Sequence, residues 1–382
     1  MYDAKTLSGN IRYFRKLSGM TQNDLAAALF VTAQNISKWE LGQSAPDISN
    51  LCRLAEVFGI TVDRMLGMET RGDGERFVAI DGGGTKTEFV LFTKDGELLD
   101  RFVGGGTNPN AYGVDGAVNE LRRGLDALAA GEVGVTAICG GIAGCGSAEM
   151  ARTITARLKK LYPVSQITVT SDIENVIAAA ECGEDAIAVI AGTGSSVFAK
   201  CGGALHRFGG WGYLYDRSYS GYDLGRDAIR ATLAAEEGSG SKTKLCELIE
   251  ARLGYRPTEA LSKLYTMTTS DVAALASDVL TAYDRGDAVA REIVTSAIKT
   301  LAHHVKTAMA KHPTCRRIII SGGLASRRDV LCAELLRYGV EGVSFVTAPQ
   351  VYGAAVGCIG GVSELTREFS QRFLTGYGNL SL

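Results

Sequence analysis

Two kinds of hydrophobic pattern divide the chain. From residue 7 to 67, apolar residues recur at helical spacing between short polar turns, which predicts five short helices. From residue 77 onward, short apolar runs alternate with glycine-containing turns and with longer helical segments, as in an α/β fold. The polar, glycine-containing residues 68–76 predict a short linker. We therefore expect an all-α domain at residues 1–67 followed by a larger α/β domain.

The α/β pattern begins with a strand, a glycine turn and a second strand. Phe77 to Ile80 is a short apolar run, Asp81 and three glycines follow it, and a second apolar run extends from Phe89 to Phe92. Glycines let backbone N–H groups approach a bulky anion because no Cβ stands in the way. Asp81 can orient a metal-bound water. Taken alone, a tight hairpin with flexible glycines would show the same pattern.

Two later stretches repeat this design and favour phosphate binding. Ala191 to Ser196 is a glycine and hydroxyl turn after the apolar run AIAVI, and Ile320 to Ala325 contains paired glycines after a third apolar strand. The sequence contains neither the Walker pattern nor G-x-G-x-x-G. Three such turns, widely separated along the chain, indicate a nucleotide held between two lobes of the larger domain.

The order of these motifs resembles a known family. DGGGTKTE at 81–88, Thr107-Asn108, AGTGS at 191–195, GGWG at 209–212 and SGGLA at 321–325 occur in the order of the N-acetylglucosamine kinase branch of the BadF/BadG/BcrA/BcrD ATPase superfamily. The resemblance covers residues from about 77 to 365. It implies an actin-like (ribonuclease H-like) ATPase fold with lobes at 77–190 and 191–382. The implied activity is that of an ATP-dependent amino-sugar kinase.

The resemblance also implies the residues of the site. ATP and Mg²⁺ would be held at the three glycine turns by Asp81, Gly82, Gly83, Gly84, Thr85, Lys86, Thr87, Gly192, Thr193, Gly194, Ser195, Gly322 and Gly323. The amino sugar would be held by Thr107, Asn108, Asp172, Thr193, Gly209, Gly210 and Asp216. For Asn108, a loop of turn-forming residues is the alternative that the sequence alone allows.

Asp172 is the expected catalytic residue. It follows a predicted strand at 167–170 and precedes the helical run VIAAA, so it lies at the carboxyl end of a strand, where α/β folds place catalytic groups. In the resembled kinases, the Asp of a T-x-D motif accepts the proton of the sugar hydroxyl. A role for Asp172 as helix N-cap is compatible with this one.

The sugar-binding loop departs from the family pattern. The resembled kinases have G-D-E-G-S-G-Y after the tryptophan, whereas this chain has DRSYSGY at 216–222. Aligned without a gap, Arg217 replaces a sugar-binding Asp; with a shift of one residue, Asp216 takes that place. Tyr219 replaces a glycine. A second interpretation is therefore open, in which a sugar-sensing transcription factor uses the kinase fold to bind its ligand without turnover.

Residues 7–67 resemble the Xre, or lambda-repressor-like, helix-turn-helix family. Thr21 and Thr32 are good N-caps for two helices separated by a tight turn, and MTQNDLA, VTAQNISKWELG and PDISNLCRLA match the family motif. Ile36 and Trp39 are expected on the core face. The resemblance implies that a double-stranded DNA operator is contacted by Gln22, Ala33, Gln34, Asn35, Ser37 and Lys38. A helical cap or a dimerisation module is the alternative.

Charge limits how this domain can bind DNA. The whole chain has 40 basic and 42 acidic residues, so no global field attracts nucleic acid or membrane. Residues 1–68 carry 7 basic and 6 acidic residues. Because one module with so little positive charge should bind weakly, we expect a homodimer.

Other sequence features exclude several classes of protein. No uncharged apolar run is long enough to span a membrane, and the first residues do not resemble a secretory signal. The nine cysteines are scattered without C-x-x-C, and there are four histidines. We therefore expect a reducing cytoplasm, no structural metal, and neither the zinc loop of ROK kinases nor the iron–sulfur cluster of ATPase activators.

Overall fold

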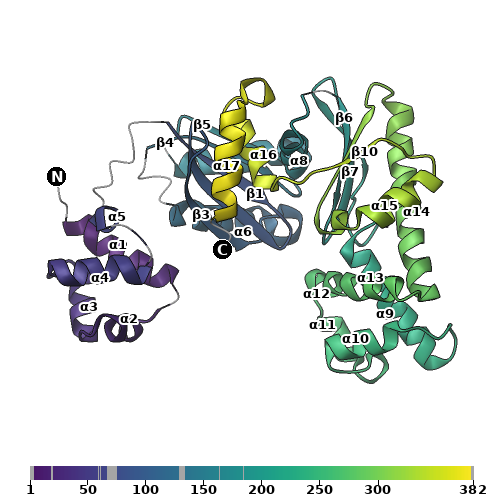
Figure 1. Ribbon diagram of the computed structural model, residues 1–382, viewed down its shortest axis with the longest axis horizontal. Coiled ribbons are helices and arrows are strands. Elements are labelled where there is room, and N and C mark those ends of the chain that lie inside the picture. The colour runs from purple at the N-terminus through teal and green to yellow at the C-terminus, as the bar shows by residue number, and fades with distance from the viewer. Residues whose placement is uncertain are drawn as a thin grey trace. The chain divides into compact units, whose positions relative to one another are not determined.

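The computed structural model describes residues 4–18, 20–58, 60, 62–66, 75–128, 134–162, 164–183 and 185–379 (Figure 1). They belong to two compact units, Met1–Gly74 and Glu75–Leu382. Residues 68–74 of the expected linker lie outside the described residues, and Arg76, its expected last residue, already belongs to the first strand.

The smaller unit is the predicted bundle of five helices. They are α1 (Ala4–Leu17), α2 (Gln22–Leu29), α3 (Ala33–Glu40), α4 (Ile48–Phe58) and α5 (Val62–Leu66). Thr21 caps α2 in a reciprocal capping box with Asp24, and the Thr32 side chain accepts a hydrogen bond from the Asn35 N–H at the start of α3. Ile36 and Trp39 are buried in the core of this unit, as their spacing predicts.

The larger unit contains two five-stranded sheets with the same topology. The first sheet has the order β3-β2-β1-β4-β5 and the second has the order β10-β9-β6-β7-β8. In each, an antiparallel meander of three strands is followed by two strands parallel to the first of them. The strands are β1 (Arg76–Gly82), β2 (Lys86–Thr93), β3 (Leu98–Gly105), β4 (Val135–Ile142), β5 (Gln166–Ser171), β6 (Ala186–Ala191), β7 (Ser195–Cys201), β8 (Ala204–Gly209), β9 (Arg317–Ser321) and β10 (Val343–Phe345). This duplication is the two-lobed, actin-like architecture that the sequence predicts.

Helices cover both faces of each sheet. In the first lobe, α6 (Pro109–Ala127) and α7 (Ala148–Leu161) pack on one face, and α16 (Gln350–Cys358) and α17 (Arg367–Asn379) pack on the other. In the second lobe, α8 (Asp172–Ala179) covers one face. The opposite face carries the helical core of that lobe, drawn from α9 (Gly221–Glu237), α10 (Leu245–Leu253), α13 (Ala276–Asp284), α14 (Ala288–Lys311) and α15 (Arg328–Arg337). Two short helices, α11 (Leu261–Thr266) and α12 (Thr269–Ala274), complete this region.

The structure differs from the sequence prediction in where the chain ends. We expected residues 191–382 to form the second lobe, but α16 and α17 lie against the first sheet, as Figure 1 shows for α17. Phe369 and Phe373 of α17 pack on Phe92 with ring centroids 6.0 and 5.5 Å apart. The apolar face of β1 and β2 is thus completed by a segment more than 250 residues later in the chain, which local patterns do not reveal.

The third glycine stretch also differs from the prediction. The first two form hairpins between β1 and β2 and between β6 and β7. The third follows β9 but leads into a 3₁₀ turn, Gly323–Ser326, rather than into another strand. Its position after a parallel strand explains this, because the chain must cross over before the next parallel strand can begin.

The helices α8 and α16 approach each other closely through Gly353. A Cβ added at Gly353 would lie 1.9 Å from the Asn175 carbonyl oxygen, well inside the contact distance of any real Cβ. Gly357, one turn later on the same helix, has no atom within 4 Å of such a Cβ. The absence of a side chain at residue 353 therefore allows α16 to contact the α8 backbone.

We predict that Gly353→Ala destabilises the larger unit while Gly357→Ala does not. The first substitution forces the two helices apart at a cost of about 1–3 kcal/mol. The second adds a better helix former in open space and changes stability by less than about 1 kcal/mol, in the stabilising direction. Thermal unfolding followed by circular dichroism measures both, and equal midpoints for the two variants would contradict the packing argument.

Candidate functional site

The two hairpin turns present backbone to open space. The turn between β1 and β2 is residues 83–85, where the Gly83 N–H donates to the Lys86 carbonyl at 2.9 Å. The turn between β6 and β7 is residues 192–194, closed by the Gly192 N–H on the Gly194 carbonyl at 2.9 Å. Thr85 and Lys86 are exposed at the first turn, and Thr193 and Ser195 are half-buried at the second.

At three glycines of the predicted phosphate-binding turns, the structure of the chain does not itself require glycine. A Cβ at Gly84, Gly194 or Gly323 would meet no atom within 4 Å, and none of the three has a left-handed backbone. Neither conformation nor packing within the described residues therefore requires glycine there. An occupant from outside the chain, approaching the backbone closely, would require it.

Other residues of the predicted phosphate-binding turns are required for the fold itself. A Cβ at Gly82 would lie 2.5 Å from Thr107 Oγ1, and Gly322 has a φ of +103° with Ala191 backbone 2.3 Å from its added Cβ. The hydroxyls of Thr87 and Thr107 are buried and lie 2.9 Å apart. We expected Thr87 to contact ATP and Thr107 to contact the sugar. In the structure these two hydroxyls bond to each other and join β2 to the segment after β3.

Asp81 and Asp172 lie close to each other beneath the first turn. Burial raises the pKa of Asp81 to about 7, and the negative charges of Asp172 and Glu88 add to this shift. The Asn175 amide opposes it by donating to Asp81 Oδ1 at 3.1 Å. Burial also raises the pKa of Asp172, against the hydrogen bond from Ser171 Oγ at 3.1 Å and the charge of Arg207.

Asp172 is the first residue of α8. The N-cap position belongs to Ser171, which makes no side-chain capping bond, so the suggestion of Asp172 as N-cap is wrong. The neighbouring acid, Glu174, is instead paired with Lys200 of β7 at 2.7 Å. Asp172 is thus the carboxylate of this helix start that lies beside Asp81 and Arg207.

Arg207 is a residue of the site that sequence analysis missed. It is the third residue from the end of β8. Its guanidinium carbon lies 4.6 Å from the ring centroid of Phe198 and 5.3 Å from that of Trp211. It donates to the Gly210 carbonyl and lies within electrostatic reach of Asp172 and Asp216. Its position two residues before the GGWG motif is the signal in the sequence that could have indicated it.

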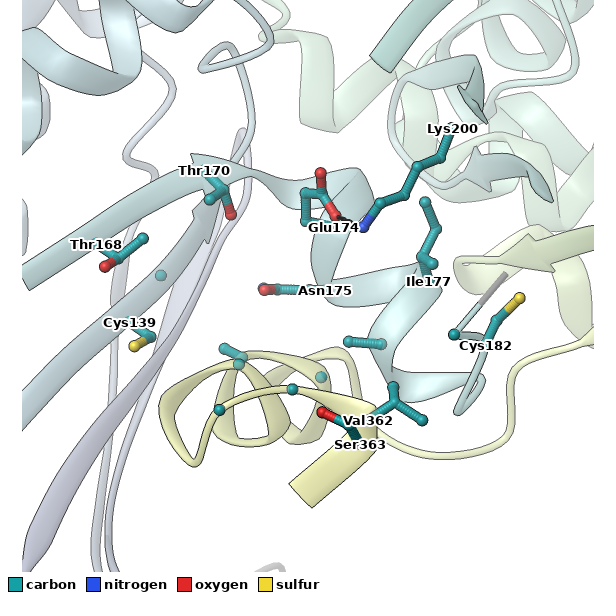
Figure 2. Close-up of a pocket in the computed structure, with 18 of the residues that line it drawn as sticks. Cys139, Thr168, Thr170, Glu174, Asn175, Ile177, Cys182, Lys200, Val362 and Ser363 are labelled. Carbon is teal, nitrogen blue, oxygen red and sulfur yellow. Dashed lines mark hydrogen bonds and ion pairs between the residues drawn. The ribbon is translucent and has the colours of Figure 1, made fainter. Parts of the chain in front are cut away.

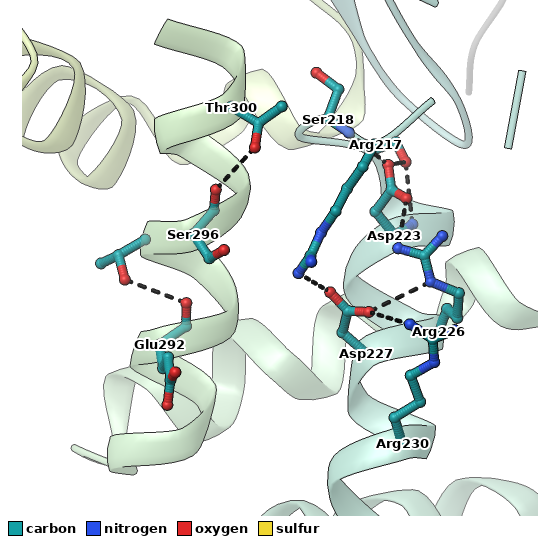
Figure 3. Close-up of polar contacts among 11 residues, drawn as sticks. Arg217, Ser218, Asp223, Arg226, Asp227, Arg230, Glu292, Ser296 and Thr300 are labelled. Atoms are coloured by element: carbon teal, nitrogen blue, oxygen red, sulfur yellow. Dashed lines mark hydrogen bonds and ion pairs between the residues drawn. The ribbon is translucent and has the colours of Figure 1, made fainter. Parts of the chain in front are cut away.

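Asp216 rather than Arg217 lies beside the GGWG turn. Its Oδ2 accepts hydrogen bonds from the Gly210 N–H at 2.6 Å and the Trp211 N–H at 3.2 Å. Arg217 turns away and pairs with Asp227 of α9, as Figure 3 shows. Of the two residues, Asp216 is therefore the one that contacts the GGWG turn, and its role as the sugar-binding Asp stays a prediction.

Tyr219, the other departure from the family pattern, is a core residue. Its side chain is fully buried in the apolar core of the second lobe. The loop around it is fixed by Asp223, which accepts from the Ser218 N–H at 3.0 Å and from Ser220 Oγ at 2.6 Å. Where the family pattern has glycine, Tyr219 thus packs into the core beneath the loop.

Asn108 caps α6. Its Oδ1 accepts a hydrogen bond from the Asn110 N–H at 2.9 Å, and Pro109 occupies the first turn of the helix. The loop after β4 passes close by, since a Cβ at Gly144 would lie 2.3 Å from Asn108 Oδ1 and one at Gly146 would lie 2.6 Å from Arg207 Nη2. This loop therefore connects the surroundings of Asn108 with those of Arg207.

His304 completes the wall behind the GGWG turn. A Cβ at Gly209 would lie 2.7 Å from His304 Nδ1, and one at Gly210 would lie 2.7 Å from the Ser195 carbonyl oxygen. Burial lowers the pKa of His304, which keeps the imidazole neutral near pH 7. The two glycines of the predicted sugar site are thus required by close packing of β8 on α14 and β7.

A separate cavity of about 710 Å³ borders α8 (Figure 2). Residues of β4, β5, α8 and α16 line it, among them Thr168, Thr170 and Asn175. The Glu174–Lys200 pair borders it. The predicted site residues are not among its lining residues, so this cavity is not the predicted nucleotide or sugar site.

The predicted DNA-binding residues lie on α3, except for Gln22, which is the first residue of α2. Gln34, Asn35 and Lys38 are exposed, and Ala33 and Ser37 are half-buried. Gln22 differs from the prediction, because its amide donates to Glu40 Oε2 at 2.9 Å. In the structure it therefore joins α2 to α3.

The buried Glu40 fixes these helices. Arg15 of α1 donates to its two carboxylate oxygens at 2.5 and 3.1 Å. Burial alone would raise the pKa of Glu40, but the hydrogen bonds from Arg15 and Gln22 outweigh it and lower the pKa. A charged Glu40 therefore holds α1, α2 and α3 together.

The duplicated sheets and the paired glycine turns define the actin-like ATPase fold. Residues 78–357 match the BadF/BadG/BcrA/BcrD ATPase family, and the chain belongs to this family. Residues 11–65 match the helix-turn-helix family, so the smaller unit is a helix-turn-helix domain.

Comparisons with individual proteins agree with this assignment. An N-acetylmuramic acid/N-acetylglucosamine kinase of Clostridium acetobutylicum is 32% identical over 272 residues, which are 68% of this chain and 89% of that protein. An N-acetyl-D-glucosamine kinase of Dictyostelium discoideum is 27% identical over 67% of this chain and 88% of its own length. The crystal structure of a candidate N-acetylglucosamine kinase from Chromobacterium violaceum superposes with a TM-score of 0.60 at 23% identity, covering 75% of this chain and 99% of that one.

Among the described residues, no helix combines the length and the apolar character needed to cross a membrane.

We predict that Asp81 contributes a specific pH dependence to the stability of the protein. Its folded-state pKa of about 7 lies above 3.8, the ordinary pKa of an Asp side chain, so its contribution to stability is present at low pH and is lost as the pH rises toward 7. The unfolding midpoint of Asp81→Asn should therefore fall less than that of the unchanged protein between pH 4 and pH 8. Differential scanning fluorimetry across this range measures the difference.

Asp271→Asn is the matched control. The hydrogen bonds of Thr268 lower the pKa of Asp271, so this group titrates below the same pH window. Its substitution should shift the midpoint by the same amount at every pH from about 5.5 to 8, since its contribution changes only as the pH falls toward the ordinary pKa of an Asp. If Asp81→Asn also gives a uniform shift, the raised pKa of Asp81 is wrong.

Proposed function

We propose that this chain is an ATP-dependent amino-sugar kinase fused to a DNA-binding domain, and that it regulates transcription in response to its sugar. The observation that supports the kinase most directly is the position of Asp172. It is within electrostatic reach of Asp81, which precedes the first glycine turn, and of Arg207, whose side chain donates to the GGWG turn. A carboxylate in that position can accept a hydrogen bond from the hydroxyl that receives the phosphoryl group, close to the nucleotide that donates it.

The glycine turns fit a nucleotide phosphate. Gly84, Gly194 and Gly323 leave open space in front of their backbones that no described side chain fills. Lys86 and Thr85 are exposed at the first turn and can donate to phosphate oxygens. Asp81 is the carboxylate that would hold Mg²⁺, since Mg²⁺ prefers carboxylate and water oxygens. Bound ATP with Mg²⁺ would supply the phosphoryl group and neutralise its charge.

The residues of this chain would position the sugar and remove its proton. Asn108, Asp216 and the GGWG turn would hold the sugar hydroxyls, and Asp172 would accept a hydrogen bond from the reacting hydroxyl. Because burial raises the pKa of Asp172, its carboxylate is a stronger base than an exposed one. The proton would pass to an Asp172 carboxylate oxygen as the sugar oxygen bonds to the γ-phosphorus of ATP, while the bond from that phosphorus to the bridging oxygen breaks and ADP leaves with its electron pair. Positioning by the surrounding residues contributes the larger share of such a rate increase.

A sugar sensor without turnover is the second candidate. The altered loop at 216–219 was the observation that favoured it, but Tyr219 lies in the core and Asp216 lies beside the GGWG turn. The 32% identity to a kinase from Clostridium acetobutylicum supports turnover. Sugar-dependent release of ADP separates the two candidates, and its absence with a panel of hexoses, amino sugars and muropeptide sugars would favour the sensor.

We predict that Asp172→Asn lowers kcat by about 10²–10⁴-fold and leaves sugar binding within a few-fold of its original affinity. The amide keeps the size of the side chain and can still bond a hydroxyl, but it cannot accept a proton. A coupled ADP assay measures turnover, and isothermal titration with N-acetylglucosamine or N-acetylmuramic acid measures binding.

Glu174→Gln is the control for this substitution. Glu174 is two residues further along the same helix and pairs with Lys200. Its loss should change stability more than kcat. If the two variants lose the same fraction of kcat, Asp172 has no special role in proton removal.

For the helix-turn-helix domain, we propose a homodimer that binds two operator half-sites through α3. Recognition helices of such dimers lie about one turn of DNA apart. Gln34 is exposed at the start of α3, where its amide can pair with adenine in the major groove. Lys38, exposed one turn later, can contact guanine or a phosphate.

We predict that Gln34→Ala weakens operator binding by about 5- to 150-fold, equivalent to ~1–3 kcal/mol, and relaxes specificity at one base pair. If Lys38 contacts a phosphate, Lys38→Ala should weaken binding to all sequences alike and reduce the salt slope by about one. An operator selected from random DNA and fluorescence anisotropy at several salt concentrations measure both. Unchanged binding in both variants would show that α3 is not the recognition helix.

A further inference from the structure

Three residues with metal-binding side chains meet in the second lobe. A carboxylate oxygen of Asp185 and the Sγ atoms of Cys201 and Cys315 all lie within 4.8 Å of one another. Cys201 and Cys315 are both free thiols. From the scattered cysteines, the absence of C-x-x-C and the four histidines, we expected no structural metal.

The sheet register explains why these residues meet. Ala186 of β6 pairs with Lys200 of β7 on one side and with Arg317 of β9 on the other. Asp185, directly before β6, is therefore opposite Cys201 at the end of β7. Cys315 lies two residues before Arg317 and so reaches the same end of the sheet. Three adjacent strands thus bring the three side chains to one edge.

We propose that Asp185, Cys201 and Cys315 bind a zinc ion that joins the ends of β6, β7 and β9. Zinc binds thiolate sulfur at about 2.3 Å and carboxylate oxygen at about 2.0–2.2 Å in a tetrahedral arrangement. Tetrahedral bonds of those lengths separate two sulfur ligands by about 4 Å. The observed spacing therefore needs only small side-chain movements, and the fourth position is left to a water molecule.

The surroundings of the cluster suit a cation. A carboxylate oxygen and two thiol sulfurs lie within 4.8 Å of one another, so deprotonated forms of these groups would repel each other. A divalent cation offsets such repulsion and stabilises thiolates. Thr314 supports the carboxylate, since its hydroxyl donates to Asp185 Oδ2 at 2.9 Å in the way that metal ligands are oriented by neighbours.

The present hydrogen bonds of the cluster leave it able to bind metal. The Gly202 N–H donates to Asp185 Oδ1 at 2.8 Å, which orients the carboxylate toward the thiols. Cys315 Sγ donates to the Lys200 carbonyl at 3.3 Å, and Cys201 Sγ lies 3.5 Å from Thr314 Oγ1. Metal binding would displace the two thiol protons and their hydrogen bonds, and would leave the bond from the Gly202 N–H to Asp185 in place.

The site would stabilise the second lobe without taking part in phosphoryl transfer. The cluster lies at the start of β6, whereas the glycine turn 192–194 follows the end of that six-residue strand. A strand of that length spans about 20 Å. Zinc at the cluster should therefore raise the unfolding temperature of the chain and leave the predicted phosphate site unchanged.

The test measures zinc affinity in purified full-length protein kept reduced with a phosphine. Competition with a chromophoric zinc chelator should give one zinc per chain. Cys201→Ser and Cys315→Ser should each weaken binding by at least about tenfold. Asp185→Asn keeps both thiols and a similar shape, so it should still fold and show an intermediate loss. In each case the zinc-dependent rise in unfolding temperature should shrink along with the affinity.

Cys332→Ser is the matched control, because Cys332 is an exposed thiol on α15 outside the cluster. It should bind zinc as the unchanged protein does. Failure of the reduced, folded protein to bind zinc would overturn the proposal. Equal affinity in the Cys201→Ser, Cys315→Ser and Cys332→Ser variants would overturn it as well, and would place any bound zinc elsewhere. Neither result depends on kinase activity.

Discussion

The side chain of Asn175 holds the centre of the larger unit together. Its amide donates to the Ile80 carbonyl at 3.2 Å and to Asp81 Oδ1 at 3.1 Å, and it lies 3.5 Å from the Gly141 carbonyl. These three residues belong to β1 and β4, while Asn175 itself belongs to α8. Since buried polar groups are costly unless paired, this arrangement admits one position of α8 on the sheet.

The candidate site depends on that position. α8 begins at Asp172, so fixing Asn175 one turn later also fixes the carboxylate next to Asp81. The other face of α8 packs on the second sheet through Ile173, Val176 and Ile177. One short helix therefore sets the geometry of the predicted base relative to both lobes. Asn175 is also absent from the sequence-based site, since nothing in SDIEN distinguishes it from a surface residue.

The sequence predicted what depends on local patterns. The helix-turn-helix fold follows from N-cap residues and apolar spacing, and the hairpins at 83–85 and 192–194 follow from glycines between apolar runs. It did not predict contacts between distant segments. Arg207 and Asp172 meet only because β8 and α8 are brought together by the fold, and Gln22 bonds to Glu40 only because α2 crosses α3. The 3₁₀ turn Gly323–Ser326 was not predicted, because paired glycines after an apolar strand do not distinguish it from a hairpin turn.

The return of the chain's end to the first lobe has a consequence for how the protein is made. Phe77, Ala79, Val90 and Phe92 face α16 and α17, which are encoded at the far end of the chain. During synthesis on the ribosome, the first sheet emerges with this apolar face uncovered and stays so until residues 350–379 follow. Synthesis at about 5–20 residues per second leaves that surface exposed for many seconds. The helix-turn-helix domain is complete well before then, so the nascent chain carries a folded DNA-binding domain ahead of a half-covered sheet.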